Sequence, residues 1–193
     1  MPQADAERRR AAFAALALQH EGDLLRAARR LCRGDADRAA DLAQDALVRA
    51  YEAYRDGRFT EGSNPRPWLL RILTNLFIND YHRRRRWESG LDVDTLTSGG
   101  EAGPAQTHAP PSEIPGVALL EGVLDEELEA ALAMLPAPLR ACVVLVDVEG
   151  LEYAEAAAAL GVPIGTVRSR LARARMRLED LLADWARHKR IRP

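Results

Sequence analysis

Apolar residues recur at three- and four-residue spacing through most of this chain, and this periodicity limits its possible folds more than any other feature. Such spacing gathers apolar side chains on one face of an α-helix. It runs through residues 13–31, 39–54 and 68–81, and again through residues 128–135, 138–147, 153–160 and 164–182. The two-residue alternation typical of strands is nearly absent. We therefore predict an all-α fold.

Residues 88–124 differ in kind from the segments on either side. They contain six acidic residues, no Lys or Arg and no aromatic residue, and they are rich in Gly, Pro, Ser and Thr. By contrast, residues 1–87 hold 17 basic and 12 acidic residues, and residues 125–193 hold 10 and 11. This composition is typical of a flexible linker. We expect two small helical domains, residues 1–87 and 125–193, joined by an acidic linker over 88–124.

Composition excludes several classes of protein. The chain has 193 residues, of which 47% are hydrophobic, but no apolar run approaches the roughly 18 residues that a transmembrane helix needs. The opening MPQADAERRRAA lacks the apolar stretch of a signal peptide. We therefore expect a cytoplasmic protein without membrane insertion. Cys32 and Cys142 have no Cys or His at ligand spacing and are expected to be buried, inert thiols; a redox pair would require the two halves to touch.

Features of a catalytic centre are also missing from the sequence. It contains no metal-ligand cluster, no nucleophile with a base at useful spacing and no glycine loop that could cradle a phosphate. Gly99 and Gly100 lie in the expected linker and do not open a helix. We expect no catalytic residues, no metal and no cofactor.

The most concentrated positive charge lies in PIGTVRSRLARARMRL, residues 163–178, which has five arginines and no acid. Wound as a helix, Ile164, Val167, Leu171, Ala174 and Leu178 form one narrow stripe that would pack on a core. The opposite face holds Thr166, Ser169, Ala172, Arg173 and Met176, flanked by Arg168 and Arg175 on one side and by Arg170 and Arg177 on the other. Small or polar residues between arginines suit base edges and phosphates of a major groove.

The residues just before this helix strengthen the DNA-binding interpretation. Residues 153–160 predict a short helix closed by Gly161, and a tight connection leads into the next helix near Pro163. This order is typical of a helix-turn-helix. A solvated surface helix is the alternative, but such helices usually mix charge signs for pairing, whereas no acid lies between Glu155 and Glu179.

A second basic segment, NPRPWLLRILTNLFINDYHRRRRW, covers residues 64–87 and holds four of the ten aromatic residues. Aromatic rings beside positive charge favour unpaired bases. On a helix, Arg71, Asn75, Ile78, His82 and Arg85 form one largely polar line, in which amides suit base edges and arginines suit phosphates. The alternative is that Trp68 and Phe77 belong to the core and that Arg83 to Arg86 form a solvated helix end.

The helix over residues 37–54 carries an acidic outer face. We expect Ala43, Ala46, Leu47, Ala50 and Tyr54 to point inward. Asp41, Asp45 and Glu52 then surround an exposed Val48, an arrangement suited to a basic partner helix. An ordinary solvated surface is equally compatible with these four residues alone.

Three segments in this order resemble bacterial sigma factors of the sigma-70 family, in the extracytoplasmic-function (ECF) branch. They are DLAQDALVRAYEAY, NPRPWLLRILTNLFINDYHRRRRW and LPAPLRACVVLVDVEGLEYAEAAAALGVPIGTVRSRLARAR. The resemblance is to the compact two-domain branch, so we expect neither the extra amino-terminal region nor the central domain of larger family members. The resemblance implies that this protein recognises promoters for RNA polymerase. It also implies that the polymerase catalyses RNA synthesis and that this protein is associated with the nucleoid through the polymerase.

The resemblance also implies partners for the residues singled out above. Asp41, Asp45, Val48 and Glu52 would bind the coiled coil of the largest subunit of core RNA polymerase, whose flap is a second expected contact. The segment that melts and reads the minus-ten element would comprise Arg71, Asn75, Asn79, His82, Arg83, Arg84, Arg85, Arg86 and Trp87, with Asn75 and Asn79 near a captured base. The surface that reads the minus-thirty-five duplex would comprise Thr166, Arg168, Ser169, Arg170, Arg173 and Arg177.

Further implications concern the linker and regulation. In the family the linker threads through the polymerase, which an acidic strand suits, although disorder without a role fits its composition equally. Family members are commonly held inactive by an anti-sigma protein. One departure is Ala156, where the family usually has a larger aliphatic residue, so this small core is expected to be looser or repacked.

Three other functions fit the sequence less well. A dimeric helix-turn-helix regulator would not need the aromatic and arginine segment. A sigma-like decoy that binds only an anti-sigma protein would not need Asn75 or Arg83 to Arg86. A nuclease would need carboxylates clustered beside the basic surface, and the sequence has none there.

Overall fold

The computed structural model describes residues 2–60, 62–89 and 124–190, and these form helices and turns without any strand. The predicted all-α class is confirmed. In chain order the elements are α1 (Pro2–Leu31), α2 (Ala36–Arg55), α3 (Pro65–Ser89), α4 (Leu124–Met134), α5 (Ala137–Val143), the π-helical turn η3 (Val144–Val148), α6 (Tyr153–Leu160) and α7 (Ile164–Arg190). All seven predicted helices exist, and most are longer than the sequence pattern indicated.

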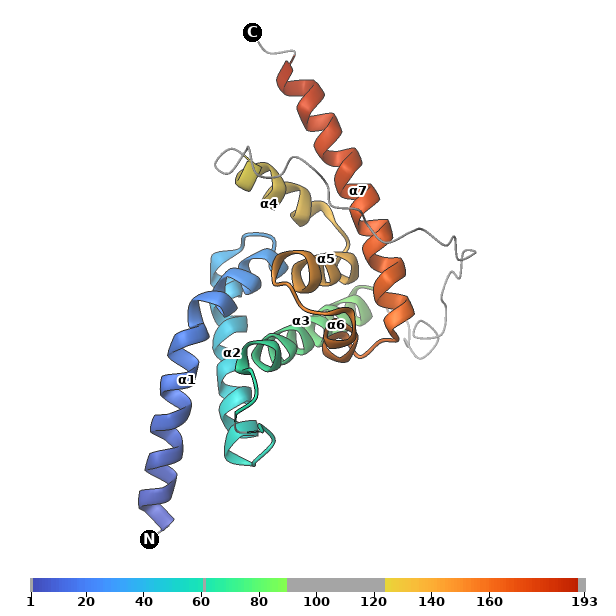
Figure 1. Ribbon diagram of the computed structural model, residues 1–193. Coiled ribbons are helices and arrows are strands. Elements are labelled where there is room, and N and C mark those ends of the chain that lie inside the picture. Colours follow the sequence, from blue (N-terminus) through green and yellow to red (C-terminus); the bar gives the residue numbers. More distant parts are fainter. Residues whose placement is uncertain (1, 61, 90–123, 191–193) are drawn as a thin grey trace.

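Helices α1, α2 and α3 form the first domain (Figure 1). Its core joins leucines of α1 to a row of small side chains on α2, which lets the two helices approach closely. The buried residues are Leu24, Ala27, Ala28 and Leu31 of α1, Ala39, Ala43, Ala46, Ala50 and Ala53 of α2, and Leu69, Leu70, Leu73 and Phe77 of α3. Leu47 and Tyr54, which we expected to point inward, are only half-buried.

Local interactions explain where these helices begin and end. After α1 the backbone turns through Arg33 and Gly34, both with positive φ, at 62° and 79°. The Asp35 side chain then accepts a 3.0 Å hydrogen bond from the Arg38 backbone N–H and caps the start of α2. Asn64 does the same for α3 by accepting from the Arg66 backbone N–H at 3.1 Å.

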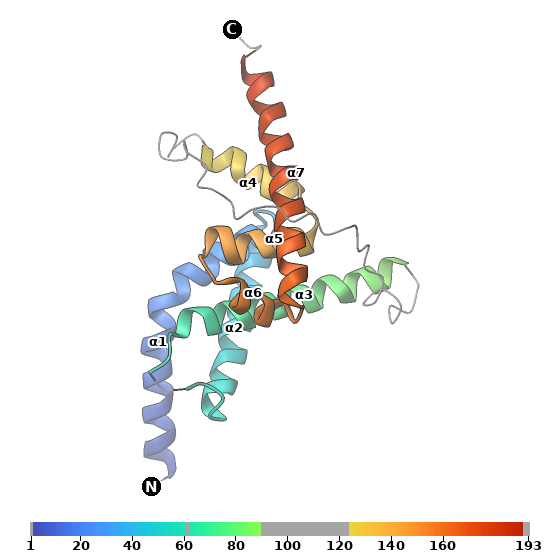
Figure 2. The ribbon, with the colours of Figure 1, turned by 45° about the vertical axis from the view of Figure 1, so that its right-hand side comes forward.

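Helices α4 to α7 form the second domain, in which α6 and α7 are the predicted helix-turn-helix. The bounds of α6 agree with the prediction. Gly161 closes α6 in the left-handed conformation, with φ of 63°, and Pro163 precedes α7. Ala156, the residue smaller than usual, is fully buried in this domain. Figure 2 shows α7 continuing well beyond the domain toward the carboxyl end.

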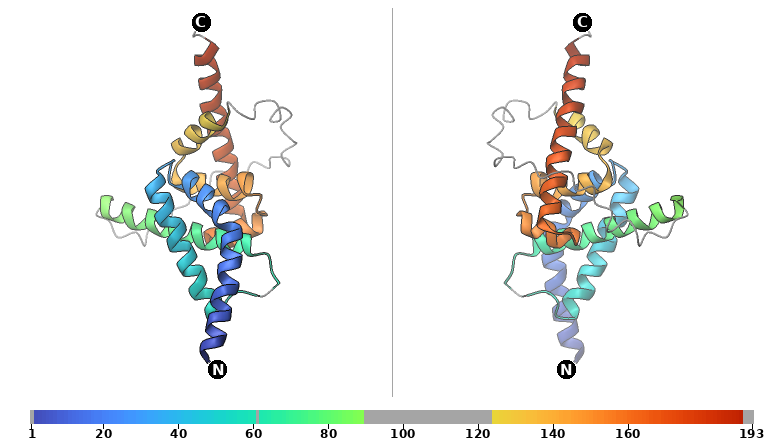
Figure 3. Two further views of the ribbon diagram at one scale, coloured as in Figure 1. Left: turned by 90° about the vertical axis from the view of Figure 1, so that its left-hand side faces the viewer. Right: turned by 90° about the vertical axis from the view of Figure 1, so that its right-hand side faces the viewer.

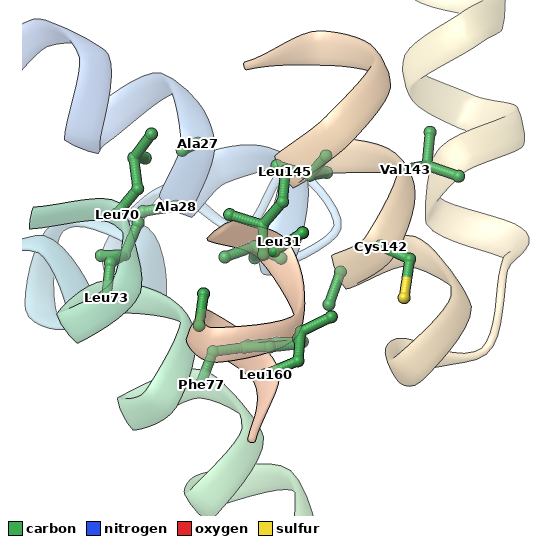
Figure 4. Close-up of a cluster of buried hydrophobic side chains, with 14 of the residues drawn as sticks. Ala27, Ala28, Leu31, Leu70, Leu73, Phe77, Cys142, Val143, Leu145 and Leu160 are labelled. Atoms are coloured by element: carbon green, nitrogen blue, oxygen red, sulfur yellow. The ribbon is translucent and has the colours of Figure 1, made fainter. Parts of the chain in front are cut away.

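The structure adds a feature that the sequence did not predict, because the two domains pack directly on each other. Helix α6 lies against α3, and α4, α5 and η3 contact α1 (Figure 3). Figure 4 shows Leu31, Leu70 and Phe77 of the first domain beside Leu145 and Leu160 of the second. The buried apolar residues of both domains therefore form one continuous cluster.

Most of the predicted linker lies outside the described residues. At its edges, residues 88 and 89 belong to α3 and residue 124 belongs to α4. Both cysteines are buried and free, as expected for thiols in a core. Burial raises the pKa of the Cys142 thiol to about 11. Burial also raises the pKa of Cys32.

Candidate nucleic-acid and polymerase interfaces

The carboxyl half of α3 projects away from the body of the molecule, as Figures 2 and 3 show. All nine residues that we expected to contact the minus-ten element are exposed: Arg71, Asn75, Asn79, His82, Arg83, Arg84, Arg85, Arg86 and Trp87. Trp87 is 86% exposed, which leaves its indole ring free to stack on a base. A nucleic acid can therefore reach all nine of these side chains along α3.

The other aromatic residues of this segment have a structural role. Trp68 packs on Phe59, with ring centroids 4.7 Å apart, and Phe59 lies 5.9 Å from Tyr54. Phe77 is 4% exposed. For Trp68 and Phe77 the core alternative is therefore correct, whereas Trp87 remains available for a ligand.

Arginines on α3 are held in place by one carboxylate. Asp80 receives Arg83 at 2.7 Å, Arg84 at 2.9 Å and Arg38 of α2 at 3.2 Å. Partial burial works to raise the pKa of Asp80, but the hydrogen bonds and charges of Arg84 and Arg83 lower it overall. Three guanidinium groups around one carboxylate leave net positive charge on this surface.

His82 lies among positive charges from both domains. Partial burial of the ring, together with the charges of Arg86, Arg170 and Arg85, lowers the pKa of His82. Because Arg170 belongs to α7, the predicted minus-ten and minus-thirty-five surfaces lie beside each other here. This proximity was not predicted from the sequence.

The acidic face of α2 is exposed as predicted. Asp41, Asp45 and Val48 are exposed, with Val48 at 57%, and Glu52 is half-buried and paired with Arg49 at 3.3 Å. Asp41 and Asp45 line a groove of about 490 Å³ whose opposite wall includes Asn79, Arg83 and Arg86 of α3. The acidic patch and the basic segment therefore share one groove.

On α7 the predicted division between buried and exposed faces is correct with one exception. Val167, Leu171, Ala174 and Leu178 are buried, but Ile164 is 41% exposed because it occupies the first position of the helix, outside the packed turn. Of the predicted base- and phosphate-contacting residues, Arg168, Ser169, Arg173 and Arg177 are exposed and Thr166 and Arg170 are half-buried.

Two arginines of α7 are turned toward the protein. Arg175 donates from Nε and Nη2 to the Asp147 carboxylate at 3.1 and 2.5 Å, which raises its pKa. Arg170 lies close enough to Cys142 to lower the pKa of that thiol, against the larger effect of burial. Arg175 therefore fixes η3 to α7, while Arg170 reaches the junction between the domains.

A buried ion-pair cluster, absent from the sequence-based site, joins the two domains. Glu149, directly after η3, has a side chain 6% exposed, and its carboxylate pairs with Arg66 of α3. Arg66 also donates to the Glu149 backbone carbonyl at 2.7 Å, and Arg30 of α1 lies 3.7 Å from the same carboxylate. Arg30 additionally pairs with Glu129 of α4 at 2.7 Å. Burial raises the pKa of Glu149, an effect that Arg66 and Arg30 oppose.

Two other kinds of site receive no support from the parts of the chain that the structure places. Within them, no group of three His, Cys, Asp or Glu side chains is arranged to hold a metal ion. None of the placed helices combines the length and the apolar character that crossing a membrane requires.

Comparison with known proteins assigns a family to both domains. Residues 16–88 match the model of sigma-70 region 2, and residues 125–178 match that of sigma-70 region 4. The chain is 40% identical over 171 residues to the ECF RNA polymerase sigma factor SigE of Mycolicibacterium smegmatis, covering 87% of this chain and 60% of that protein. It is 43% identical over 152 residues to the ECF RNA polymerase sigma factor EcfG of Rhodopseudomonas palustris, covering 77% and 74%.

Solved structures agree with this assignment. The sigma factor RpoE of Bartonella quintana, crystallised with the anti-sigma factor NepR, matches with a TM-score of 0.62 and 31% identity, covering 89% of this chain and 97% of that one. CnrH in complex with the cytosolic domain of CnrY matches with a TM-score of 0.58 and 27% identity, covering 91% and 90%. This chain therefore belongs to the ECF branch of the sigma-70 family of RNA polymerase sigma factors.

Proposed function

We propose that this protein binds core RNA polymerase, directs it to specific promoters and helps to open them. The observation that carries the proposal is the presence of two exposed arginine-rich surfaces, one on α3 and one on α7, in two domains that both match sigma-70 regions. Synthesis of RNA belongs to the polymerase in this proposal. The cytoplasmic location that we expect from the sequence follows from that partnership.

For the second domain we propose duplex recognition at the minus-thirty-five element. The exposed Arg168, Ser169 and Arg173 lie near the start of α7, the part of a recognition helix that reaches base edges. Arg173 Nε donates to the Ser169 backbone carbonyl at 3.3 Å, which holds its guanidinium along the helix. Guanidinium groups suit the paired acceptors of guanine and the oxygens of phosphates.

For the first domain we propose capture of unpaired bases at the minus-ten element. Extruding a base costs a few kcal/mol, which protein contacts must offset. The exposed Asn75 and Asn79 can bond a base edge, Trp87 can stack on a base, and the Arg83 to Arg86 run can hold the backbone. Capture on this surface shifts the equilibrium toward open DNA.

We propose that the packed arrangement of the two domains is an inactive one. By their names, the two promoter elements lie about 25 base pairs apart, which at about 3.4 Å per base pair is roughly 85 Å of duplex. Here α6 lies against α3, and Arg170 of α7 is close to His82 of α3. Simultaneous contact with both elements therefore requires the domains to separate.

An anti-sigma protein is the partner that we propose for regulation. Its support is the likeness, over most of the chain, to a sigma factor crystallised with the anti-sigma factor NepR. A protein that favours the packed arrangement would keep the two DNA-binding surfaces too close together for a promoter.

Run-off transcription with purified core polymerase and genomic fragments tests the proposed function. We expect discrete transcripts that depend on this protein, and their start sites would define its promoters. If the polymerase with this protein starts no RNA on any fragment, the proposed function is wrong.

Arg173→Ala tests the proposed contact with the minus-thirty-five element. Loss of one guanidinium contact to a base pair should cost about 1–3 kcal/mol of discrimination. The measurement is transcription from a set of promoters that vary only at this element. Arg58→Ala, which removes a 65% exposed arginine far from α7, is the matched control and should leave selectivity unchanged. Unchanged selectivity in Arg173→Ala would remove this residue from the site.

Asn75→Ala tests the proposed capture of unpaired bases. Loss of a hydrogen bond made only to an extruded base, worth about 1 kcal/mol, should reduce opening several-fold. Binding of closed DNA should change little. Permanganate reactivity of thymines in the melted region measures opening, and electrophoretic mobility shift measures closed binding. Gln44→Ala, an exposed amide on α2, is the control. Equal losses in both assays would argue against a role restricted to open DNA.

A further inference from the structure

A positively charged cavity lies where the two domains meet. It has a volume of about 410 Å³, and its walls come from the end of α1, the start of α2, α3 and the start of α5. Arg33, Arg38, Arg84 and Arg85 line it from the first domain, and Arg140 of α5 lines it from the second. An ordinary protein surface mixes acidic and basic residues, whereas, within residues 2–60, 62–89 and 124–190, this cavity is lined by five arginines and no acidic residue.

Arg140 is the unusual member of this group because it is buried without a counterion. It is 3% exposed, and its Nε has no hydrogen-bond partner. Its Nη1 donates to the backbone carbonyls of Ala133 at 3.1 Å and Leu135 at 3.4 Å, and its guanidinium carbon lies 5.9 Å from the centre of the Phe77 ring. Burial and the nearby positive charges of Arg33 and Arg38 lower its pKa to about 10. An unpaired buried charge is costly, so a site with this geometry favours an added anion.

Carboxylates near the cavity leave two of its five arginines, Arg33 and Arg140, without an ion pair among the described residues. Asp80 is shared among Arg38, Arg84 and Arg83, the last of which lies outside the cavity. Arg33 and Arg140 have no carboxylate within 4 Å in the part of the chain that the structure describes. One arginine on each side of the domain junction, Arg33 and Arg140, is therefore available to pair with an added anion.

The shape and chemistry of the cavity limit its ligand. Guanidinium groups bind phosphate oxygens in pairs, and several of them converging from different helices match a ligand with several charged oxygens. A cavity of this volume lies within the range of about 300–1,000 Å³ that small-molecule sites occupy. Tyr81 lines the same cavity and offers a ring face and a hydroxyl, to which Arg85 donates at 3.3 Å. A di- or triphosphate, free or at the end of a nucleotide, satisfies these requirements better than a single carboxylate.

We propose that this junction is a binding site for a di- or triphosphate group and that its occupation stabilises the packed arrangement of the two domains. The ligand would neutralise Arg33 of the first domain and Arg140 of the second at once. Because an anion that touches both domains has its full set of partners only when they are packed, it binds that state more tightly and shifts the population toward it. The inhibitory consequence rests on the proposed function, whereas ligand binding and domain packing do not.

Titration calorimetry of the full chain with inorganic pyrophosphate, at low ionic strength, tests the site directly. We expect saturable binding of one pyrophosphate per chain that weakens as salt is added. Arg33→Asn should weaken it about tenfold or more, because one charge-assisted contact is lost. Asparagine tolerates the positive φ of 62° at this position, and Arg33 is exposed, so folding should be preserved. Arg140→Gln should weaken binding further, and Arg58→Gln, distant from the junction, should not.

A second measurement tests the effect on the domains without using polymerase. Fluorescence energy transfer between labels at Gln44→Cys and Glu179→Cys, both exposed positions, reports the separation of the two domains. Pyrophosphate should narrow the distribution of distances toward the packed state in the wild type and not in Arg33→Asn. A nucleoside triphosphate tested in parallel shows whether a base on Tyr81 adds affinity.

Three results would overturn the proposal. They are the absence of saturable binding, binding that is indifferent to Arg33→Asn, or binding that leaves the domain separation unchanged. A single-stranded oligonucleotide is the competitor: if it binds through Arg33 and Arg140 while pyrophosphate does not, these arginines belong to the nucleic-acid surface. If Arg140→Gln fails to fold, Arg33→Asn decides the outcome. Binding to core polymerase and to closed promoter DNA, measured without nucleotides by gel filtration and mobility shift, tests the proposed function separately.

Discussion

Replacing Arg66 with alanine is expected to separate the two domains. The change leaves the Glu149 carboxylate, 6% exposed, without its main partner, and the Glu149 carbonyl without its donor. Removing one partner of a buried ion pair costs about 3–5 kcal/mol, and Arg30, 3.7 Å away, offsets only part of this. Energy transfer between labels at Gln44→Cys and Glu179→Cys should show longer distances, and chemical unfolding should begin at lower denaturant concentration.

Arg55→Ala is the matched control for this experiment. Arg55 is an arginine of the same domain that pairs with Asp56, but its side chain is 60% exposed. Surface pairs of this kind contribute about 0–1 kcal/mol, so both measurements should stay close to wild type. Adding Glu149→Ala to Arg66→Ala should recover part of the loss, because the orphaned charge is then removed. A wild-type distance distribution in Arg66→Ala would contradict the role given to this pair.

Charge reversal on α2 is expected to prevent assembly with core polymerase. In the doubly substituted Asp45→Arg, Glu52→Arg, a surface proposed to meet a basic helix becomes basic itself. Placing like charges opposite each other costs several kcal/mol, and a loss of about 3 kcal/mol weakens binding roughly 100-fold. Gel filtration of the protein with core polymerase measures the assembly.

The fold should survive this change, because Asp45 is exposed and Glu52 has a side chain 43% exposed. Circular dichroism checks this point. Glu7→Arg, Glu21→Arg, which reverses two exposed carboxylates on α1, is the control for net charge and should still assemble. Normal co-elution of the doubly substituted protein with core polymerase would remove the acidic patch from the proposed interface.

Sequence periodicity predicted the elements well and their packing poorly. The bounds of α6 and the buried stripe of α7 follow from local rules, namely a glycine that ends a helix and apolar residues at regular spacing. Leu70, Leu73 and Phe77 also belong to such a pattern. The pattern indicates that their face is buried, but it does not say that the second domain helps to cover it.

The contacts that join the two domains could not be predicted from the sequence, because the residues that make them lie far apart along the chain. Glu149 and Arg66 are 83 positions apart, and neither stands out among the many charged residues of its segment. Arg140 appears in the sequence as one basic residue on an amphipathic helix. Its burial without a counterion becomes visible only when α5 lies against α3.

The wide turn η3 determines which residue faces Arg66. The backbone N–H of Glu149, the residue directly after η3, donates to the Val144 carbonyl, five residues earlier. In a regular α-helix it would donate to the carbonyl four residues earlier. One extra residue in the coil is thus enough to rotate the following side chain by about a quarter turn. Deletion of one residue from η3 should therefore leave α6 and α7 intact but rotate the Glu149 side chain away from Arg66.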